Sequence, residues 1–224
     1  MPEIYGTDTG AATGRFICAG ALRLAYRLNV LNANLVPATG PVILAANHIG
    51  ALDGALIIAA SPRPIFTVAK SGIFVPVIDN ILRWGGLIPI EYDQADRKAI
   101  LASLAVLDRG GVLGLFPEGH RGGGRIATMR SGISYLALRS GATVVPLTLF
   151  GTRRTGQGKN SLPLPGSRLD VVFGVPFVPE PRDWHRRSEM ALSAGEIQSR
   201  LADEVQQAMA RIGRTLPEDD LGLD

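Results

Sequence analysis

Residues 42–60 read VILAANHIGALDGALIIAA, and this stretch gives the strongest indication of the fold. Residues 42–46 are all apolar, which is typical of a strand buried beneath helices on both faces. A short polar connection follows, and residues 53–60 have the apolar pattern of a buried helix. The stretch therefore predicts a strand, a connection and a helix of an α/β protein.

The same alternation continues along the chain. Further strands are predicted for short apolar runs at residues 65–68, 87–90, 112–116, 144–149 and 169–173. Further helices are predicted between them at residues 94–107 and 132–139. The alternation favours an α/β fold with a mostly parallel central sheet flanked by helices, and 224 residues suit a single domain over residues 1–224. Ser193 and Glu196 form a capping box that predicts the start of a C-terminal surface helix.

An N-terminal amphipathic helix is predicted over about residues 14–31. Apolar residues recur at spacings of three and four, and the arginines lie elsewhere on the helical wheel. The apolar residues are Phe16, Ala19, Leu22, Tyr26 and Val30, and the arginines are Arg15, Arg23 and Arg27. Such a helix could dock on anionic lipid or pack on the body of its own domain, and both interpretations stay open. The longest uncharged run, residues 28–47, contains four Asn and two Pro and does not suit a spanning helix.

Composition excludes several classes of function. A formal net charge of +3 over 224 residues is too small to indicate nucleic-acid binding. Cys18 is the only cysteine, so an internal disulfide and a thiolate metal cluster are excluded, and the three histidines lack metal-ligand spacing. Gly151 and Gly156 have the spacing that opens a phosphate-binding loop, but Gln157 stands where the lysine should be. Because no Gly-x-Ser-x-Gly motif occurs, a serine hydrolase of that type is also excluded.

His48 and Asp53 lie in the connection that opens the first helix. Five residues apart, they would diverge by roughly 140° on one continuous helix. They can meet if His48 precedes the helix, Gly50 lets the backbone turn and Asp53 begins the helix. An aspartate on one imidazole nitrogen leaves the other free to take a proton from a substrate hydroxyl. The alternatives are a helix N-cap for Asp53 and a hydrogen-bonded polar residue at a strand end for His48.

A second polar segment, PEGHRGGG at residues 117–124, directly follows the predicted strand 112–116. The guanidinium of Arg121 suits a phosphate, and the glycines allow the backbone to approach an anion closely. Glu118 could position Arg121 or accept a hydrogen bond from an acceptor hydroxyl. The alternative is a flexible glycine-rich turn with a solvated arginine.

Three motifs in a fixed order resemble a known family. They are Asn47-His48-x4-Asp53, Phe116-Pro117-Glu118-Gly119-x-Arg121 and Val145-Pro146-Leu147. Together, over about residues 40–175, they resemble the glycerolphosphate acyltransferase superfamily, and most closely its small 1-acylglycerol-3-phosphate acyltransferases.

The resemblance implies a role for each matching residue. His48 would be the general base, and Asp53 would orient it. Glu118, Gly119 and Arg121 would form the loop that binds the acceptor, with Arg121 on its phosphate. Lys70, which ends Val68-Ala69-Lys70, resembles a family lysine that helps hold this phosphate, although a lone surface lysine is the alternative.

The resemblance also implies an activity and its partners. The chain would move a fatty acyl group from acyl-CoA or acyl carrier protein to the free hydroxyl of 1-acylglycerol 3-phosphate, in phospholipid biosynthesis. It would need no cofactor, metal or nucleic acid, and it would act as a peripheral protein at the cytoplasmic face of a membrane. Aliphatic and aromatic residues expected to line an acyl groove are Leu56, Ile57, Ile73, Phe74 and Val77.

Two departures from the family pattern concern the acceptor. Glu91-Tyr92 stands where the family has an arginine after residues 86–90, so Arg97 or Arg130 would have to supply that phosphate contact. His120 replaces the usual Thr or Ser. A different lipid or sugar acceptor is therefore an alternative. A noncatalytic lipid-binding module and a thioester hydrolase are two others.

Overall fold

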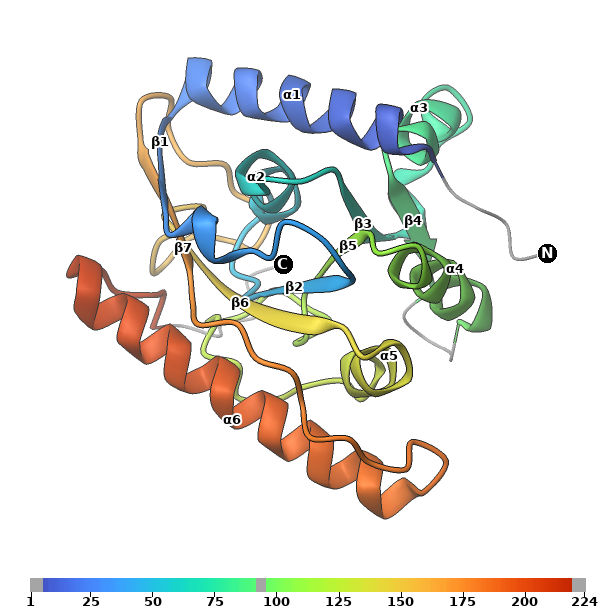
Figure 1. The fold of residues 1–224 in the computed structure, drawn as a ribbon. Helices are drawn as coiled ribbons and strands as arrows, with labels where there is room; N and C mark the ends of the chain where they lie inside the picture. The colour runs from blue at the N-terminus through green and yellow to red at the C-terminus, as the bar shows by residue number, and fades with distance from the viewer. Residues whose placement is uncertain (1–5, 92–95, 219–224) are drawn as a thin grey trace.

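The computed structural model describes residues 6–91 and 96–218. These residues form a central sheet with helices packed against it (Figure 1). The helices, strands and 3₁₀ turns of these residues are α1 (Asp8–Ala25), β1 (Arg27–Leu31), η1 (Ala33–Leu35), β2 (Val42–Ala46), α2 (Asp53–Ala60), β3 (Ile65–Lys70), η2 (Ser71–Ile73), α3 (Asp79–Trp84), β4 (Leu87–Ile90), α4 (Arg97–Asp108), β5 (Val112–Leu115), α5 (Gly132–Ser140), β6 (Thr143–Phe150), β7 (Arg168–Phe173) and α6 (Arg187–Ile212).

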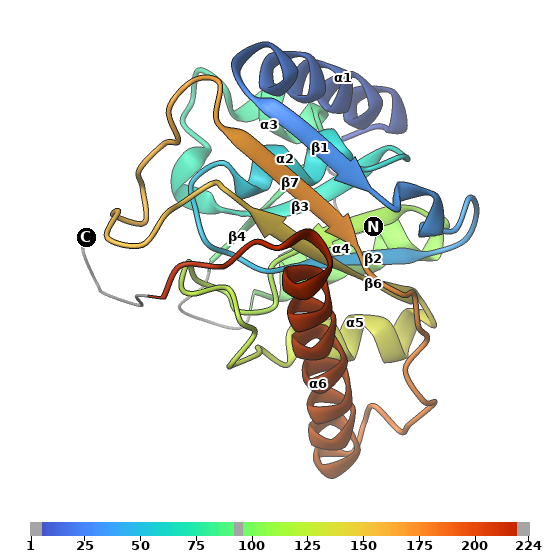
Figure 2. The same ribbon diagram turned by 90° about the vertical axis from the view of Figure 1, so that its left-hand side faces the viewer.

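The sheet confirms the expected α/β class. Its strand order within the described chain is β1-β7-β6-β2-β5-β3-β4. The central strand β2 pairs in parallel with β5 and β6, and β3 pairs in parallel with β5 and β4. β7 is antiparallel to β6, whereas β1 is parallel to β7, and Figure 2 shows β1 and β7 running side by side. The sheet is therefore mostly parallel, with β1 and β7 reversed.

Helices cover both faces of the sheet, with α1 and α2 on one side and α4, α5 and α6 on the other (Figure 1). Successive residues of β2 point to opposite faces. Val42, Leu44 and Ala46 pack with α1 and α2, whereas Ile43 and Ala45 pack with α4, α5 and α6. Each of the five is at most 2% exposed, so β2 is buried on both faces, as its apolar run predicts.

The other predicted strands and helices are present, with ends that differ by one or two residues where both ends lie in the described chain. Residues 94 and 95 of the predicted helix 94–107 lie outside the described residues. The structure adds α3 and two 3₁₀ turns that the sequence did not predict.

The predicted N-terminal helix over residues 14–31 is wrong at both ends. α1 begins at Asp8, where the Thr7 hydroxyl accepts a hydrogen bond from the Gly10 N–H at 3.0 Å. It ends at Ala25, and residues 27–31 form β1 beside β7. The Asn29 side chain donates to the buried Asp170 carboxylate at 2.8 Å, a contact that only the extended backbone next to β7 provides.

The predicted capping box at Ser193 and Glu196 is also wrong. α6 begins six residues earlier, at Arg187, and continues through Ser193. Ser193 lies within the helix, its side chain is fully buried, and it caps no helix end. Residues 187–192 include Arg, Glu, Met, Ala and Leu, all strong helix formers, and these extend the helix toward its N-terminus.

The carboxyl ends of β2, β5 and β3 lie at one edge of the sheet. Ala45 of β2 lies opposite Leu115 of β5, and Thr67 of β3 lies opposite Gly114 of β5. The connections that leave these three strands therefore begin side by side. Ligands bind at this edge in open α/β sheets.

Candidate active site

His48 and Asp53 are in contact. The distance from His48 Nδ1 to Asp53 Oδ2 is 2.8 Å, and the same oxygen accepts hydrogen bonds from the N–H groups of Ile49 at 2.6 Å and Gly50 at 2.8 Å. Asp53 is the first residue of α2, but the N-cap of that helix is Leu52, so the N-cap interpretation of Asp53 is wrong. Its fully buried carboxylate instead turns back toward the connection and holds the imidazole.

The His48 ring has one nitrogen left for chemistry. Because the carboxylate of Asp53 takes the hydrogen on Nδ1, the neutral ring carries its lone pair on Nε2. The ring stacks on Phe116, with centroids 4.1 Å apart and an angle of 18° between the planes. The side chain is 16% exposed. The imidazole is therefore fixed in orientation and partly open to a ligand.

Thr152 and Arg153 complete the support of this pair, and the sequence did not predict their role. The Thr152 hydroxyl donates to Asp53 Oδ1, so both oxygens of that carboxylate are bonded. The guanidinium of Arg153 is buried and donates from Nε to the carbonyl of Ile49 at 2.8 Å and from Nη2 to the carbonyl of Gly122 at 2.9 Å. Arg153 thus ties the His48 connection to the glycine-rich loop.

Glu118 contacts the backbone of the His48 connection, and its expected contact with an acceptor hydroxyl stays a prediction. It is buried, and its carboxylate accepts hydrogen bonds from the N–H groups of His48 at 2.9 Å and Ile126 at 3.2 Å. Burial raises the pKa of the Glu118 carboxyl, and these two N–H donors act in the opposite direction. Arg121, which Glu118 was expected to position in one of its two suggested roles, donates instead to the Asn160 side chain. Glu118 therefore fixes the backbone of His48 relative to the glycine-rich loop.

Two glycines of the loop lie in close contact with other side chains, and the expected approach of the loop to an anion stays a prediction. Gly119 has a φ of +71°, and a Cβ at this position would lie 2.3 Å from Nε of Arg130, whose side chain crosses it. Gly124 also has a φ of +71°, and a Cβ there would lie 2.3 Å from a methyl group of Ile49. A larger residue at either position would push the loop away from the His48 connection.

Lys70 is the last residue of β3 and is exposed. Because Thr67 lies opposite Gly114, the register places Lys70 level with Pro117. Lys70 is thus at the same edge of the sheet as His48, about two strand spacings, or roughly 10 Å, along it. The position suits the predicted phosphate contact, which stays a prediction.

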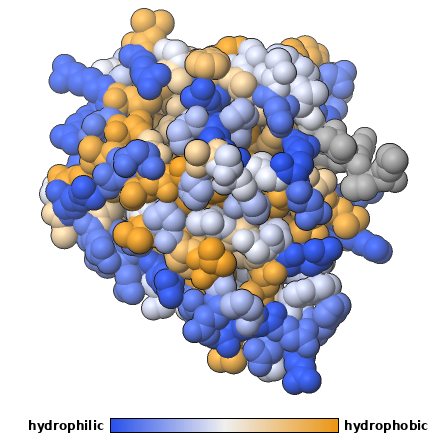
Figure 3. Space-filling view, in the orientation of Figure 1, coloured by the Kyte–Doolittle hydropathy of each residue, from blue (hydrophilic) through white to orange (hydrophobic). Residues whose placement is uncertain are grey.

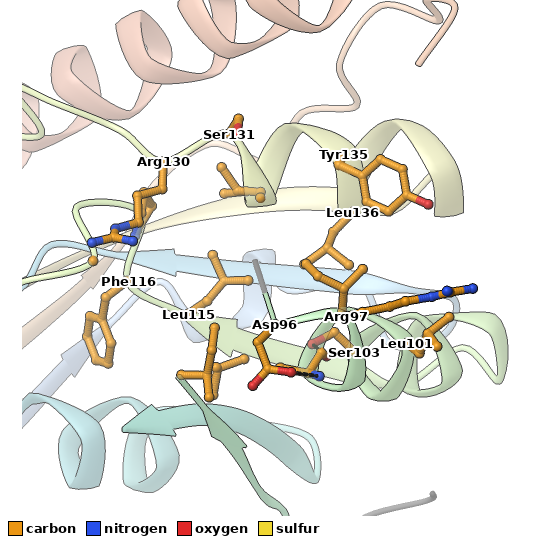
Figure 4. Close-up of a pocket in the computed structure, with 18 of the residues that line it drawn as sticks. Asp96, Arg97, Leu101, Ser103, Leu115, Phe116, Arg130, Ser131, Tyr135 and Leu136 are labelled. Carbon is orange, nitrogen blue, oxygen red and sulfur yellow. Dashed lines mark hydrogen bonds between the residues drawn. The ribbon is translucent and has the colours of Figure 1, made fainter. Parts of the chain in front are cut away.

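A cavity of about 990 Å³ opens between β5, α4 and α5 and reaches this edge. Figure 4 shows Phe116 and Arg130 at one end and Arg97, Leu101 and Tyr135 toward the other. The apolar side chains that line it are Val68, Ile90, Ile100, Leu101, Leu115, Phe116, Ile133, Leu136 and Met190. Because Phe116 also stacks on His48, the cavity ends beside the imidazole.

The residues predicted to line an acyl groove lie elsewhere. Leu56 and Ile57 are fully buried between α2 and the sheet, whereas Ile73 and Val77 are exposed on another part of the surface. Phe74 does not line the cavity either. Apolar sequence alone does not separate core, cavity wall and surface. Glu91 lines the cavity, and its neighbour Tyr92 lies outside the described residues.

Two further observations concern metals and membranes. Within residues 6–91 and 96–218, His, Cys, Asp and Glu nowhere form a group of three or more that could hold a metal ion. The described helices include none that is both long and apolar enough to cross a bilayer.

Comparison with known proteins places these features among acyltransferases. A model of the Acyltransferase family matches residues 27–149. The chain is 29% identical over 131 residues to a 1-acyl-sn-glycerol-3-phosphate acyltransferase of Borreliella burgdorferi, covering 56% of this chain and 52% of the relative. It is 28% identical over 132 residues to the chloroplastic enzyme LPAT1 of Arabidopsis thaliana, covering 57% of this chain and 37% of the relative. The matches thus span about half, or less, of these two curated relatives.

The fold is also similar to a solved structure, that of the 1-acyl-sn-glycerophosphate (LPA) acyltransferase PlsC from Thermotoga maritima. The TM-score is 0.65 with 18% sequence identity, over 88% of this chain and 79% of the other. At this identity the likeness supports the fold.

Proposed function

This chain belongs to the Acyltransferase family, and on that premise we propose that it transfers a fatty acyl group from a thioester donor to the free hydroxyl of 1-acylglycerol 3-phosphate. The observation that carries the proposal is the His48–Asp53 pair at the end of an apolar cavity. Acyl-CoA and acyl carrier protein both fit as donor. The chemistry requires no metal or cofactor.

In the proposed reaction, His48 Nε2 accepts the proton of the acceptor hydroxyl while the oxygen attacks the thioester carbonyl. Asp53 stabilises the imidazolium that forms. The C–S bond then breaks, the new ester remains on the acceptor, and the proton on Nε2 passes to the leaving sulfur to give the free thiol. No covalent intermediate with the protein forms.

Thr152 is expected to position Asp53 for this step. Thr152→Val should lower kcat about ten-fold with little change in the KM of either substrate. The reason is that Oδ1 of Asp53 loses its hydrogen-bond donor, so the Asp53 carboxylate can turn away from His48. Thr152→Ser keeps the hydroxyl and should retain most of the wild-type kcat. Steady-state kinetics of the two variants, with their free energies of unfolding, provide the comparison. Equal losses of kcat would remove the role of the hydroxyl.

We propose that the acceptor phosphate binds between Arg121 and Lys70, with Arg130 as the replacement for the family arginine. Arg130 lies over Gly119 at the His48 end of the cavity, whereas Arg97 lies toward the far end (Figure 4). Arg130 is therefore the better placed of the two arginines.

Arg121→Ala should raise the KM of the phosphorylated acceptor ten-fold or more, the size expected for a lost hydrogen bond to a charged group. The KM of the thioester should change much less. Arg125→Ala, an exposed arginine of the same loop, is the matched control. Initial rates over both substrate concentrations give the two KM values. If phosphorylated and unphosphorylated acceptors lose activity equally, Arg121 does not bind the phosphate.

The cavity is proposed to hold the acyl chain of the donor. Its volume of about 990 Å³ is at the upper end of the range for small-molecule sites, about 300–1,000 Å³. Burial of each CH₂ group contributes about 0.8 kcal/mol, so an apolar cavity favours long chains. The Phe116 end would bring the thioester carbonyl to His48.

Gly132 offers a test of this role. It lines the cavity at the first turn of α5, and a Cβ there meets no atom within 4 Å. Gly132→Phe should therefore fill part of the cavity and lower kcat/KM at least ten-fold for a palmitoyl thioester, but much less for a butyryl thioester. Gly195→Phe is the control, because Gly195 of α6 also has open space around its Cβ position and lies outside the cavity. An equal loss for both chain lengths would argue against the acyl site.

Glu91 favours a second candidate, the acylation of a neutral lipid or sugar acceptor. It lines the cavity where the family pattern has an arginine, and a carboxylate there would repel a phosphate. The test offers the purified protein acyl-CoA or acyl carrier protein thioesters with 1-acylglycerol 3-phosphate, glycerol 3-phosphate and neutral acceptors. Thiol release that rises only with phosphorylated acceptors supports the first candidate, and a rise only with neutral acceptors supports the second. Release that no acceptor increases indicates a hydrolase, and no release at all indicates a noncatalytic module.

A peripheral position at the cytoplasmic face of a membrane is part of the proposal. Ala19 and Leu22 of α1 are buried against the body of the domain, while Phe16, Ile17 and Leu24 are 66%, 65% and 92% exposed. α1 therefore uses one face for packing and presents another apolar face that suits a lipid surface.

A further inference from the structure

The segment that joins β3 to β4 exposes more large apolar side chains than its length explains. We call residues 71–84 the outer arm, which consists of η2, a turn and α3. Its exposed apolar side chains are Ile73 at 45%, Val75 at 48%, Val77 at 87%, Ile78 at 39%, Ile81 at 64% and Trp84 at 45% exposure. Single exposed apolar residues are ordinary, whereas a group of six within one short segment indicates a contact surface.

The base of the outer arm is held in place by α1. Gly6, Gly10 and Gly14 are spaced four residues apart and lie against the backbone of residues 83–85. A Cβ at Gly10 would lie 2.0 Å from the carbonyl oxygen of Trp84, so only glycine allows this approach. The outer arm is therefore packed against α1 at its base, while its apolar side chains remain exposed.

The outer arm and the exposed face of α1 lie on the same side of the molecule. Figures 1 and 2 both place α1 and α3 at the top. In Figure 3, orange side chains reach the upper edge where α1 and α3 run, whereas the region of α6 at the bottom is mainly blue. Phe16 and Ile17 follow Gly14, which lies against Gly85, so α1 adds exposed apolar side chains close to the base of the outer arm.

Positive charges outnumber negative ones around this surface. Asp8, at the start of α1, pairs with Arg109 at 3.4 Å, and Asp53, the one acidic residue among residues 9–78, is fully buried. Arg23, Arg27 and Lys70 are exposed. Within the outer arm, Asp79 pairs with Arg83 at 2.7 Å, so the arm itself has no net charge. An apolar surface with a positive surround complements anionic lipid headgroups.

The outer arm also begins at the edge of the sheet that carries the site. It follows directly after Lys70, whose strand ends level with the Phe116–Arg121 loop. A lipid that keeps its acyl chain in the bilayer beside the outer arm would present its headgroup hydroxyl at this edge. Trp84 fits the same surroundings, because tryptophan favours the boundary between headgroups and hydrocarbon.

A second copy of the chain fits the surface less well. A stable interface buries about 800 Å² on each partner and uses about 20–30 residues a side, which is more than the outer arm offers. A symmetric pairing through this surface would also bring like positive charges together. We therefore infer that the outer arm inserts into the surface of an anionic lipid bilayer and delivers lipid acceptor to the His48 edge. The delivery rests on the proposed function; the insertion does not.

The binding test is flotation of the full chain with vesicles of phosphatidylglycerol and phosphatidylcholine, and with phosphatidylcholine alone. The double variant Val77→Asp/Ile81→Asp should bind the anionic vesicles at least ten-fold more weakly than the wild type. Leu164→Asp/Leu192→Asp is the matched control, because both leucines are exposed apolar residues outside the outer arm and α1. The control should bind the anionic vesicles as the wild type does. The wild type and the control should both bind the neutral vesicles more weakly than the anionic ones.

The activity test separates the surface from the chemistry. With a short-chain, water-soluble acceptor, Val77→Asp/Ile81→Asp should keep the wild-type rate within two-fold, and with acceptor embedded in anionic vesicles it should lose at least ten-fold. Wild-type binding and rate on vesicles in this variant would overturn the inference. So would a wild-type dimer in sedimentation that the variant converts to monomer. If no acceptor is ever acylated but vesicle binding still depends on the outer arm, the proposed function fails and the insertion stands.

Discussion

His48→Ala is expected to lower kcat for acyl transfer about 10²- to 10⁴-fold, the range for loss of a general base. The KM of the thioester should change little, because the acyl chain is expected to bind in the cavity and not on the imidazole. The fold should persist, since the His48 backbone N–H donates to Glu118 and its carbonyl accepts from Gly122, and the substitution alters neither group.

The control for His48 is His185→Ala, an exposed histidine near the start of α6. Rates with saturating thioester and acceptor, together with thermal unfolding, separate a chemical defect from a folding defect. A His48→Ala protein that keeps the wild-type kcat would show that another group removes the proton.

Asp53→Asn should lower kcat by a similar order, about 10²- to 10⁴-fold, because the substitution removes the charge that stabilises the imidazolium and can favour the wrong tautomer. The asparagine oxygen can still accept from the N–H groups of Ile49 and Gly50, and its NH₂ group can donate to the Thr152 hydroxyl. The variant should therefore fold. Asp8→Asn, which changes an exposed carboxylate, is the control. Full activity of Asp53→Asn would leave Asp53 as a residue that shapes only the connection.

The sequence predicted the parts of the fold that local pattern determines. The central strand Val42–Ala46 and the helix Asp53–Ala60 agree with their apolar runs. The prediction that His48 and Asp53 can meet agrees with the contact between their side chains. In each case the residues concerned are close in the chain. The single domain over residues 1–224 and the roles of Lys70 and Arg121 stay predictions.

The features that sequence did not predict depend on partners far along the chain. β1 has a helical apolar spacing, and it forms a strand because residues 168–172 of β7 lie beside it. Thr152 reaches Asp53 across 99 residues, and Glu118 reaches the backbone of His48 across 70. One signal was present for Thr152 and Arg153, since two polar residues directly follow the predicted strand 144–149. The spacing of Gly151 and Gly156 around them resembles only a phosphate-binding loop that lacks its lysine.

We propose that His48, held by Asp53, activates the hydroxyl of the acceptor for attack on a thioester. The most direct test is mass spectrometry of the lipid products after wild type and His48→Ala are each incubated with acyl-CoA and 1-acylglycerol 3-phosphate. We expect the wild type to form one diacyl product for each thiol released, and His48→Ala to form about 10²-fold less or lower. Free fatty acid in place of the diacyl product, or equal product from both proteins, would contradict the claim.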